Sequence, residues 1–111
     1  MGLGLFENYS QTIENARQEY RRPLKVNFPP KYVFNKVSAF LKENKFQEIK
    51  TNEKFFDLWA KVNGFEYSFQ ISSESMFDTY INISVYGEHK RGLTRGKLKK
   101  ISILVSEYIK D

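Results

Sequence analysis

The residues that decide the fold read FFDLWAKVNGFEYSFQISS and run from position 55 to position 73. Asn63 and Gly64 stand between two segments rich in aromatic and β-branched residues, and an Asn-Gly pair in that setting is the strongest short-range signal for a β-hairpin turn. A two-residue turn fixes the register, because Val62 then faces Phe65 and every other facing pair follows. The sequence therefore predicts an antiparallel hairpin over 55–73.

This register gives the hairpin one apolar face and one mixed face, because side chains alternate along a strand. The pairs that share the apolar face are Ala60 with Tyr67, Leu58 with Phe69, and Phe56 with Ile71. Lys61 faces Glu66 on the mixed face, where opposite charges on neighbouring strands attract each other. Phe55 and Trp59 lie on this mixed face as well.

The segments on both sides of the hairpin predict an α+β fold with one antiparallel meander sheet. Alternating apolar residues indicate further strands over 24–28, 46–51 and 78–87, and apolar residues at steps of three and four indicate helices over 5–22, 31–44 and 93–111. The predicted order is an N-terminal helix followed by β-α-β-β-β-β-α, with the helices packed on one face of the sheet. We assign 1–23 to the N-terminal amphipathic helix and 24–111 to a single α+β domain.

The composition excludes several kinds of site. The chain has 111 residues, no cysteine and one histidine, which rules out disulfides, thiol catalysis and a zinc site built from cysteine or histidine. No apolar run approaches the roughly 18 residues of a membrane span, and a chain without cysteine fits a reducing cytoplasm. We therefore expect a small soluble cytoplasmic protein that holds neither a metal nor a cofactor.

The charged residues favour binding over catalysis. The 18 basic and 13 acidic residues give a net charge of +5, which biases encounters toward polyanions. His89 lies in a basic segment without an evident carboxylate to orient it, and Asp57 has no second carboxylate beside it in the predicted register. We expect no enzymatic activity.

A basic segment between the last strand and the last helix shares its glycine spacing with phosphate-binding loops. GEHKRGLT at 87–94 matches a P-loop except that Leu93 stands where the motif requires lysine. The N–H groups at a helix start attract anions even without that lysine, and the backbone at Gly92–Gly96 would approach a bound phosphate closely. The residues expected to contact phosphates are Lys90, Arg91, Arg95, Lys97 and Lys100. The alternative is a solvated basic turn.

Aromatic residues gather on the sheet face turned away from the helices. They are Phe55, Trp59, Tyr80 and Tyr86. An exposed tryptophan beside tyrosine and lysine is suited to stacking bases, as in proteins that bind single strands. We favour the alternative that this face is covered, either by the N-terminal helix or by another protein or a second copy of the chain, because large exposed apolar patches are rare on monomers. The apolar stripe of that helix, which includes Phe6, Tyr9, Ile13 and Tyr20, would lie over Phe55 and Trp59.

The order of elements from 24 to 110 resembles a reduced helix-grip domain, the architecture of START and polyketide-cyclase-like ligand binders. The similar segments are KVNFPPKYVFNKVSAFLKE at 25–43 and GLTRGKLKKISILVSEYI at 92–109. The resemblance implies an apolar ligand cavity between the sheet and the last helix. Its lining would include Tyr67, Phe69, Ile83 and Ile101.

Three functions stay open on the sequence alone. The favoured one is a non-enzymatic binding module that contacts an anionic partner, either phosphate or nucleic acid, through 89–100. The second is a small apolar ligand binder of the helix-grip type. The third is a protein interaction or adaptor domain whose N-terminal helix alternates between free and docked states.

Overall fold

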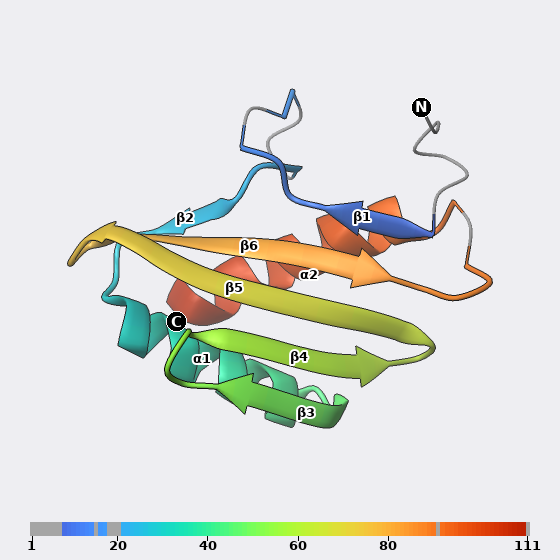
Figure 1. Cartoon of the computed structure of the whole chain (residues 1–111), viewed down its shortest axis with the longest axis horizontal. Helices are drawn as coiled ribbons and strands as arrows, with labels where there is room; N and C mark the ends of the chain where they lie inside the picture. Colours follow the sequence, from blue (N-terminus) through green and yellow to red (C-terminus); the bar gives the residue numbers. More distant parts are fainter. Residues whose placement is uncertain (1–7, 15, 18–20, 91, 111) are drawn as a thin grey trace.

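A computed structural model describes residues 8–14, 16–17, 21–90 and 92–110 and has an α+β fold (Figure 1). The elements are β1 (Tyr9–Gln11), β2 (Leu24–Val26), α1 (Pro30–Glu43), β3 (Gln47–Asn52), β4 (Asp57–Val62), β5 (Phe65–Ser75), β6 (Asp78–Tyr86) and α2 (Thr94–Lys110). The strands form one open antiparallel sheet in the order β1-β6-β5-β4-β3, and β2 also pairs with β6. The predicted fold class is therefore confirmed.

The central hairpin has the predicted register. Asn63 and Gly64 both have positive φ angles, 52° and 83°, as a type I′ turn requires. Val62 faces Phe65, and the pairing continues without a shift to Asp57 opposite Gln70. The apolar residues of β4 and β5 consequently point to one face of the sheet.

Both helices cover that face, and Figure 1 shows them behind the sheet. The sheet contributes Val26, Leu58, Ala60, Phe65, Tyr67, Phe69, Ile71, Ile81, Ile83 and Val85 to the buried core. The buried apolar residues of the helices are Val33, Phe34, Val37, Phe40, Leu41, Leu98, Ile101, Val105 and Ile109. The core of the described residues lies on this face, and we call the opposite face of the sheet the outer face.

The helix predicted over 5–22 is wrong where the structure describes that segment. Tyr9–Gln11 forms β1, and the described residues from Thr12 to Arg17 are not helical. Ile13, which the helical pattern placed on a buried stripe, is 47% exposed. The physical reason is the edge of β6, whose backbone groups pair with β1 and outweigh a weak helical periodicity. The rest of the predicted stripe at 6 and 20 lies outside the described residues.

Two short strands and one threonine cover the edge of β6. β1 pairs with residues 84–86 and β2 with residues 79–81, which leaves a gap at residues 82 and 83. Thr12 fills it: its N–H donates to the Ile83 carbonyl at 2.8 Å, and its Oγ1 accepts the Ile83 N–H at 3.0 Å. The edge is thereby protected from pairing with another chain.

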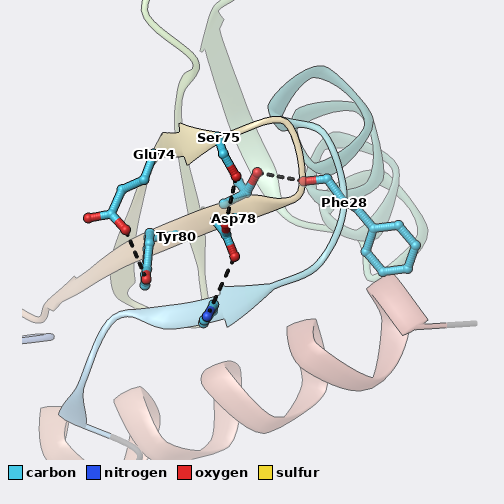
Figure 2. A network of polar contacts seen from close by, with 7 residues as sticks. Phe28, Glu74, Ser75, Asp78 and Tyr80 are labelled. Atoms are coloured by element: carbon cyan, nitrogen blue, oxygen red, sulfur yellow. Dashed lines mark hydrogen bonds and ion pairs between the residues drawn. The ribbon is translucent and has the colours of Figure 1, made fainter.

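A polar network holds the far end of the β5–β6 hairpin (Figure 2). Ser75 Oγ donates to Asp78 at 2.6 Å, and Lys25 Nζ of β2 lies 3.5 Å from the same carboxylate. The Ser75 hydrogen bond, followed by the charge of Lys25, lowers the pKa of Asp78. Thr79 Oγ1 donates to the carbonyl of Phe28 at 2.5 Å, which ties the segment before α1 to β6.

Candidate functional site

The connection from β6 to α2 folds against the turn between β4 and β5. Lys90 Nζ lies 5.7 Å and Lys97 Nζ 5.2 Å from the centre of the Phe65 ring, which is only 4% exposed. Two lysines from different elements therefore share one buried ring through cation–π contacts. We call Lys90, Arg95, Lys97 and Lys100 the basic corner. The last three of these residues lie in the first two turns of α2.

Close packing against glycine fixes the position of Lys90. A Cβ added to Gly87 would lie 2.7 Å from both Cβ and Cγ of Lys90 and 2.9 Å from Cδ1 of Phe65. A Cβ on Gly64 would lie 3.1 Å from Lys90 Cε. The first glycine of the 87–94 motif therefore accommodates the lysine stem rather than a phosphate, and the P-loop interpretation fails on geometry as well as on sequence.

Gly96, in contrast, has no neighbour that explains it. It lies in the first turn of α2, it is exposed, and a Cβ there would meet nothing within 4 Å. Glycine at such a position destabilises a helix by roughly 0.5–1 kcal/mol relative to alanine. The backbone at Gly96 is consequently open to a ligand.

The cations of the basic corner have no carboxylate partner among the described residues. None of the carboxylates in the described part of the chain forms an ion pair with Lys90, Arg95, Lys97 or Lys100. The Nε atom of Arg95 is buried, and it has no hydrogen-bond partner among the described residues. His89 is separate from this group, because its exposed ring pairs with Glu88 at 3.4 Å. Arg91, the fifth predicted cation, lies outside the described residues.

A hollow of about 560 Å³ crosses the outer face over β1, β6, β5, β4 and β3. We call it the outer trough. Its lining is mostly hydroxyl and amide groups, among them Gln11, Asn52, Ser68, Gln70, Asn82 and Ser84. Trp59 and Lys50 lie on one side, and Tyr9 lies on the other. The trough is a polar surface with an aromatic wall.

Trp59 is the one predicted outer-face aromatic residue that lines this trough. It is half-buried, and Lys50 Nζ and Lys61 Nζ lie 5.0 Å and 5.4 Å from its ring centre. Tyr80 lines a second hollow of about 420 Å³, and Tyr86 is half-buried outside both hollows. Phe55 is 60% exposed beside β4.

The described part of the N-terminal segment does not lie over Phe55 and Trp59 as predicted, and positions 6 and 20 of that prediction lie outside the described residues. Its described strand β1 lies beside β6 within the sheet, because pairing with that edge places it in the plane of the strands. Tyr9, expected to cover Phe55 and Trp59, is instead 42% exposed at the far side of the trough. The outer face is therefore open over the described residues.

Lys50 and Tyr9 are among the trough residues that the sequence did not predict. Lys50 faces Trp59 because the register between β3 and β4 shifts after Gln47, where Glu48 has a positive φ of 51°. No turn signal announces this bulge. Tyr9 joins the trough only through the pairing of β1 with β6, which a helical interpretation of that segment could not give.

The expected apolar cavity has no counterpart in the hollows described here. Tyr67, Phe69, Ile83 and Ile101 are all packed in the core, and each is at most 5% exposed. Burial raises the pKa of Tyr67 to about 12. Phe69 and Ile83 also line the outer trough, but no residue of α2 lines either hollow.

Comparison with protein-family models, curated proteins and solved structures found no match for this chain. The described helices include none that is long and apolar enough to cross a membrane. The described residues also hold no cluster of three or more histidine, aspartate or glutamate side chains that is suited to a metal ion. Function is therefore inferred from the basic corner and the outer trough.

Proposed function

We propose that this protein is a non-enzymatic binding module that contacts nucleic acid through the basic corner. One observation carries the proposal: Lys90 and Lys97 both contact the Phe65 ring, and α2 adds Arg95 and Lys100 in its first two turns. No described carboxylate forms an ion pair with any of these four cations. Neutralising phosphates with such cations releases counterions and favours binding.

The position of these cations supports a bound anion. The start of a helix carries a partial positive charge, so cations placed there destabilise the free protein slightly. The first turn of α2 contains no acidic residue to offset this effect. A phosphate would interact favourably with both the helix start and the lysines, and the open backbone at Gly96 leaves room for it to approach.

The test is the salt dependence of binding to a fluorescein-labelled single-stranded oligonucleotide, measured by anisotropy. If four phosphates are contacted, log Kd changes with log salt at a slope of about 2.8, which is roughly a 50-fold loss of affinity between 50 and 200 mM salt. The double variant Lys97→Ala/Lys100→Ala should lower the slope to about 1.4 and the loss to roughly 7-fold.

A matched control removes the same charge elsewhere. Lys42 and Lys110 are exposed lysines in the last turns of α1 and α2, away from the basic corner. The double variant Lys42→Ala/Lys110→Ala should keep the slope of the unmodified protein. Equal slopes in the two double variants, or no binding at 50 mM salt, would contradict the proposal.

A further inference from the structure

We propose that the outer trough receives unpaired bases of a single-stranded nucleic acid, with one base stacked on Trp59. This inference rests on the proposed function and specifies its ligand. The trough would contact the bases of the strand, and the basic corner, on the side of the sheet that carries the helices, would contact phosphates farther along it. Three properties of the trough support this assignment: a partly exposed aromatic ring, amide groups beside it, and positive charge at its aromatic wall.

The shape of the trough leaves space next to the Trp59 ring. One row of facing residues crosses it from β1 to β3, in the order Gln11, Ser84, Ser68, Trp59 and Lys50. The two serines are small, so the sheet is low between the tryptophan and the glutamine. Neighbouring strands are about 4.8 Å apart, which puts Trp59 about 14 Å from Gln11. Flat bases fit in that space, and stacking on an aromatic side chain tolerates any base.

A second row of residues supplies the groups that recognise base edges. It runs from β3 to β6 in the order Asn52, Asp57, Gln70 and Asn82. Amide side chains donate and accept hydrogen bonds, as the edges of bases do. The Oδ1 atom of Asp57 is buried, and it has no partner among the described residues. The bases of a duplex are stacked and paired inside the helix, so this arrangement favours a single strand.

The charge near Trp59 selects a phosphate-bearing ligand over a neutral one. Lys50 and Lys61 both lie over the ring, and a strand whose base stacks there brings its backbone close to them. Lys61 is also held 3.8 Å from Glu48, whereas Lys50 forms no ion pair with a described carboxylate. A neutral oligosaccharide would use the ring and the amides, but it would gain nothing from these cations.

Trp59 is the chain's one tryptophan, so its emission reports on the trough directly. A single-stranded oligonucleotide should quench that emission in a saturable way, and the same sequence as a duplex should not. Trp59→Leu should weaken anisotropy-detected binding roughly 5–150-fold, since stacking on an aromatic ring contributes about that much. Phe55→Leu removes an exposed aromatic residue outside the trough and should leave binding unchanged.

A second variant keeps Trp59 but fills the space beside its ring with a larger side chain. Ser68 is a partly exposed outward position on β5, so Ser68→Leu should fold and should nevertheless lose both the quenching and most of the affinity. Far-ultraviolet circular dichroism confirms that each variant is folded. Unquenched emission, or an affinity that neither Trp59→Leu nor Ser68→Leu changes, would overturn the inference.

Binding at the basic corner and stacking in the trough give separate readouts. If Lys97→Ala/Lys100→Ala weakens binding while the oligonucleotide leaves Trp59 emission unquenched, the basic corner binds nucleic acid and the trough does not. If no oligonucleotide binds at 50 mM salt, both fail together. Quenching by maltoheptaose but not by the oligonucleotide would assign the trough to a neutral sugar, and equal quenching by a duplex would exclude single-strand recognition.

Discussion

Replacing Thr12 by valine should destabilise the sheet by removing one acceptor at the edge of β6. Valine has nearly the shape of threonine, so the change opens no cavity. Ile83 is 1% exposed, and its N–H donates to the Thr12 hydroxyl oxygen at 3.0 Å. The valine variant removes this acceptor. The second bond at this position, from the Thr12 N–H to the Ile83 carbonyl at 2.8 Å, belongs to the backbone and remains.

The expected loss is about 1–3 kcal/mol in the free energy of unfolding, because a buried N–H is left without a partner. Typical domains have about 5–15 kcal/mol in total, so the effect is large enough to measure. Thr12→Ser keeps the hydroxyl and deletes one methyl group, which removes about 0.8 kcal/mol of apolar burial at most. Serine should therefore be the milder replacement.

Urea unfolding followed by Trp59 emission gives the free energies, and hydrogen exchange of the Ile83 amide gives the local effect. The amide should exchange much faster in the valine variant and close to normally in the serine variant. A valine variant within about 0.5 kcal/mol of the unmodified protein, with the Ile83 amide still protected, would refute the role of the hydroxyl as the acceptor that seals this edge.

Three further substitutions follow from the described contacts. Gly87→Ala should cost about 1–3 kcal/mol in thermal unfolding, since the new Cβ would lie 2.7 Å from Lys90 Cβ, and an unchanged melting temperature would contradict that packing. Gly96→Ala should raise the unfolding free energy by roughly 0.5–1 kcal/mol yet weaken oligonucleotide binding, and unaltered binding would show that no ligand approaches this backbone. Burial raises the pKa of Tyr67 to about 12, so above pH 10 the unfolded chain ionises this tyrosine first and stability falls as the pH rises toward 12. Tyr67→Phe should remove up to about 2–3 kcal/mol of that alkaline loss, and urea midpoints with identical pH slopes in both proteins would argue against it.

The sequence was informative wherever local signals agreed with each other. Asn63-Gly64 specifies both the turn and the register, and the alternation on either side specifies the buried face, so the central hairpin and its outward Trp59 could be predicted. The clustering of Lys90 and Lys97 was visible in the same way, although their shared contact with Phe65 was not.

The predictions failed where distant segments decide the local structure. β1 is a strand because β6 offers it an edge, and no periodicity within residues 9–11 encodes that partner. The outer trough combines side chains from five strands, and its lysine is placed by a bulge at Glu48. Such a site depends on tertiary pairing, which propensity and pattern describe poorly.

The pairing of β1 and β2 with β6 also constrains how the protein is made. The two N-terminal strands leave the ribosome first, but their partner at 79–86 emerges last among the strands. At about 5–20 residues per second, β1 waits roughly 4–15 s for β6. During that interval β1 and β2 have no β6 edge to pair with. Neighbouring nascent chains translated from the same mRNA therefore expose unpaired strand backbone to each other. Pairing of the whole sheet therefore waits until residue 86 has emerged, and slow translation before that residue would lengthen the period in which aggregation competes with folding.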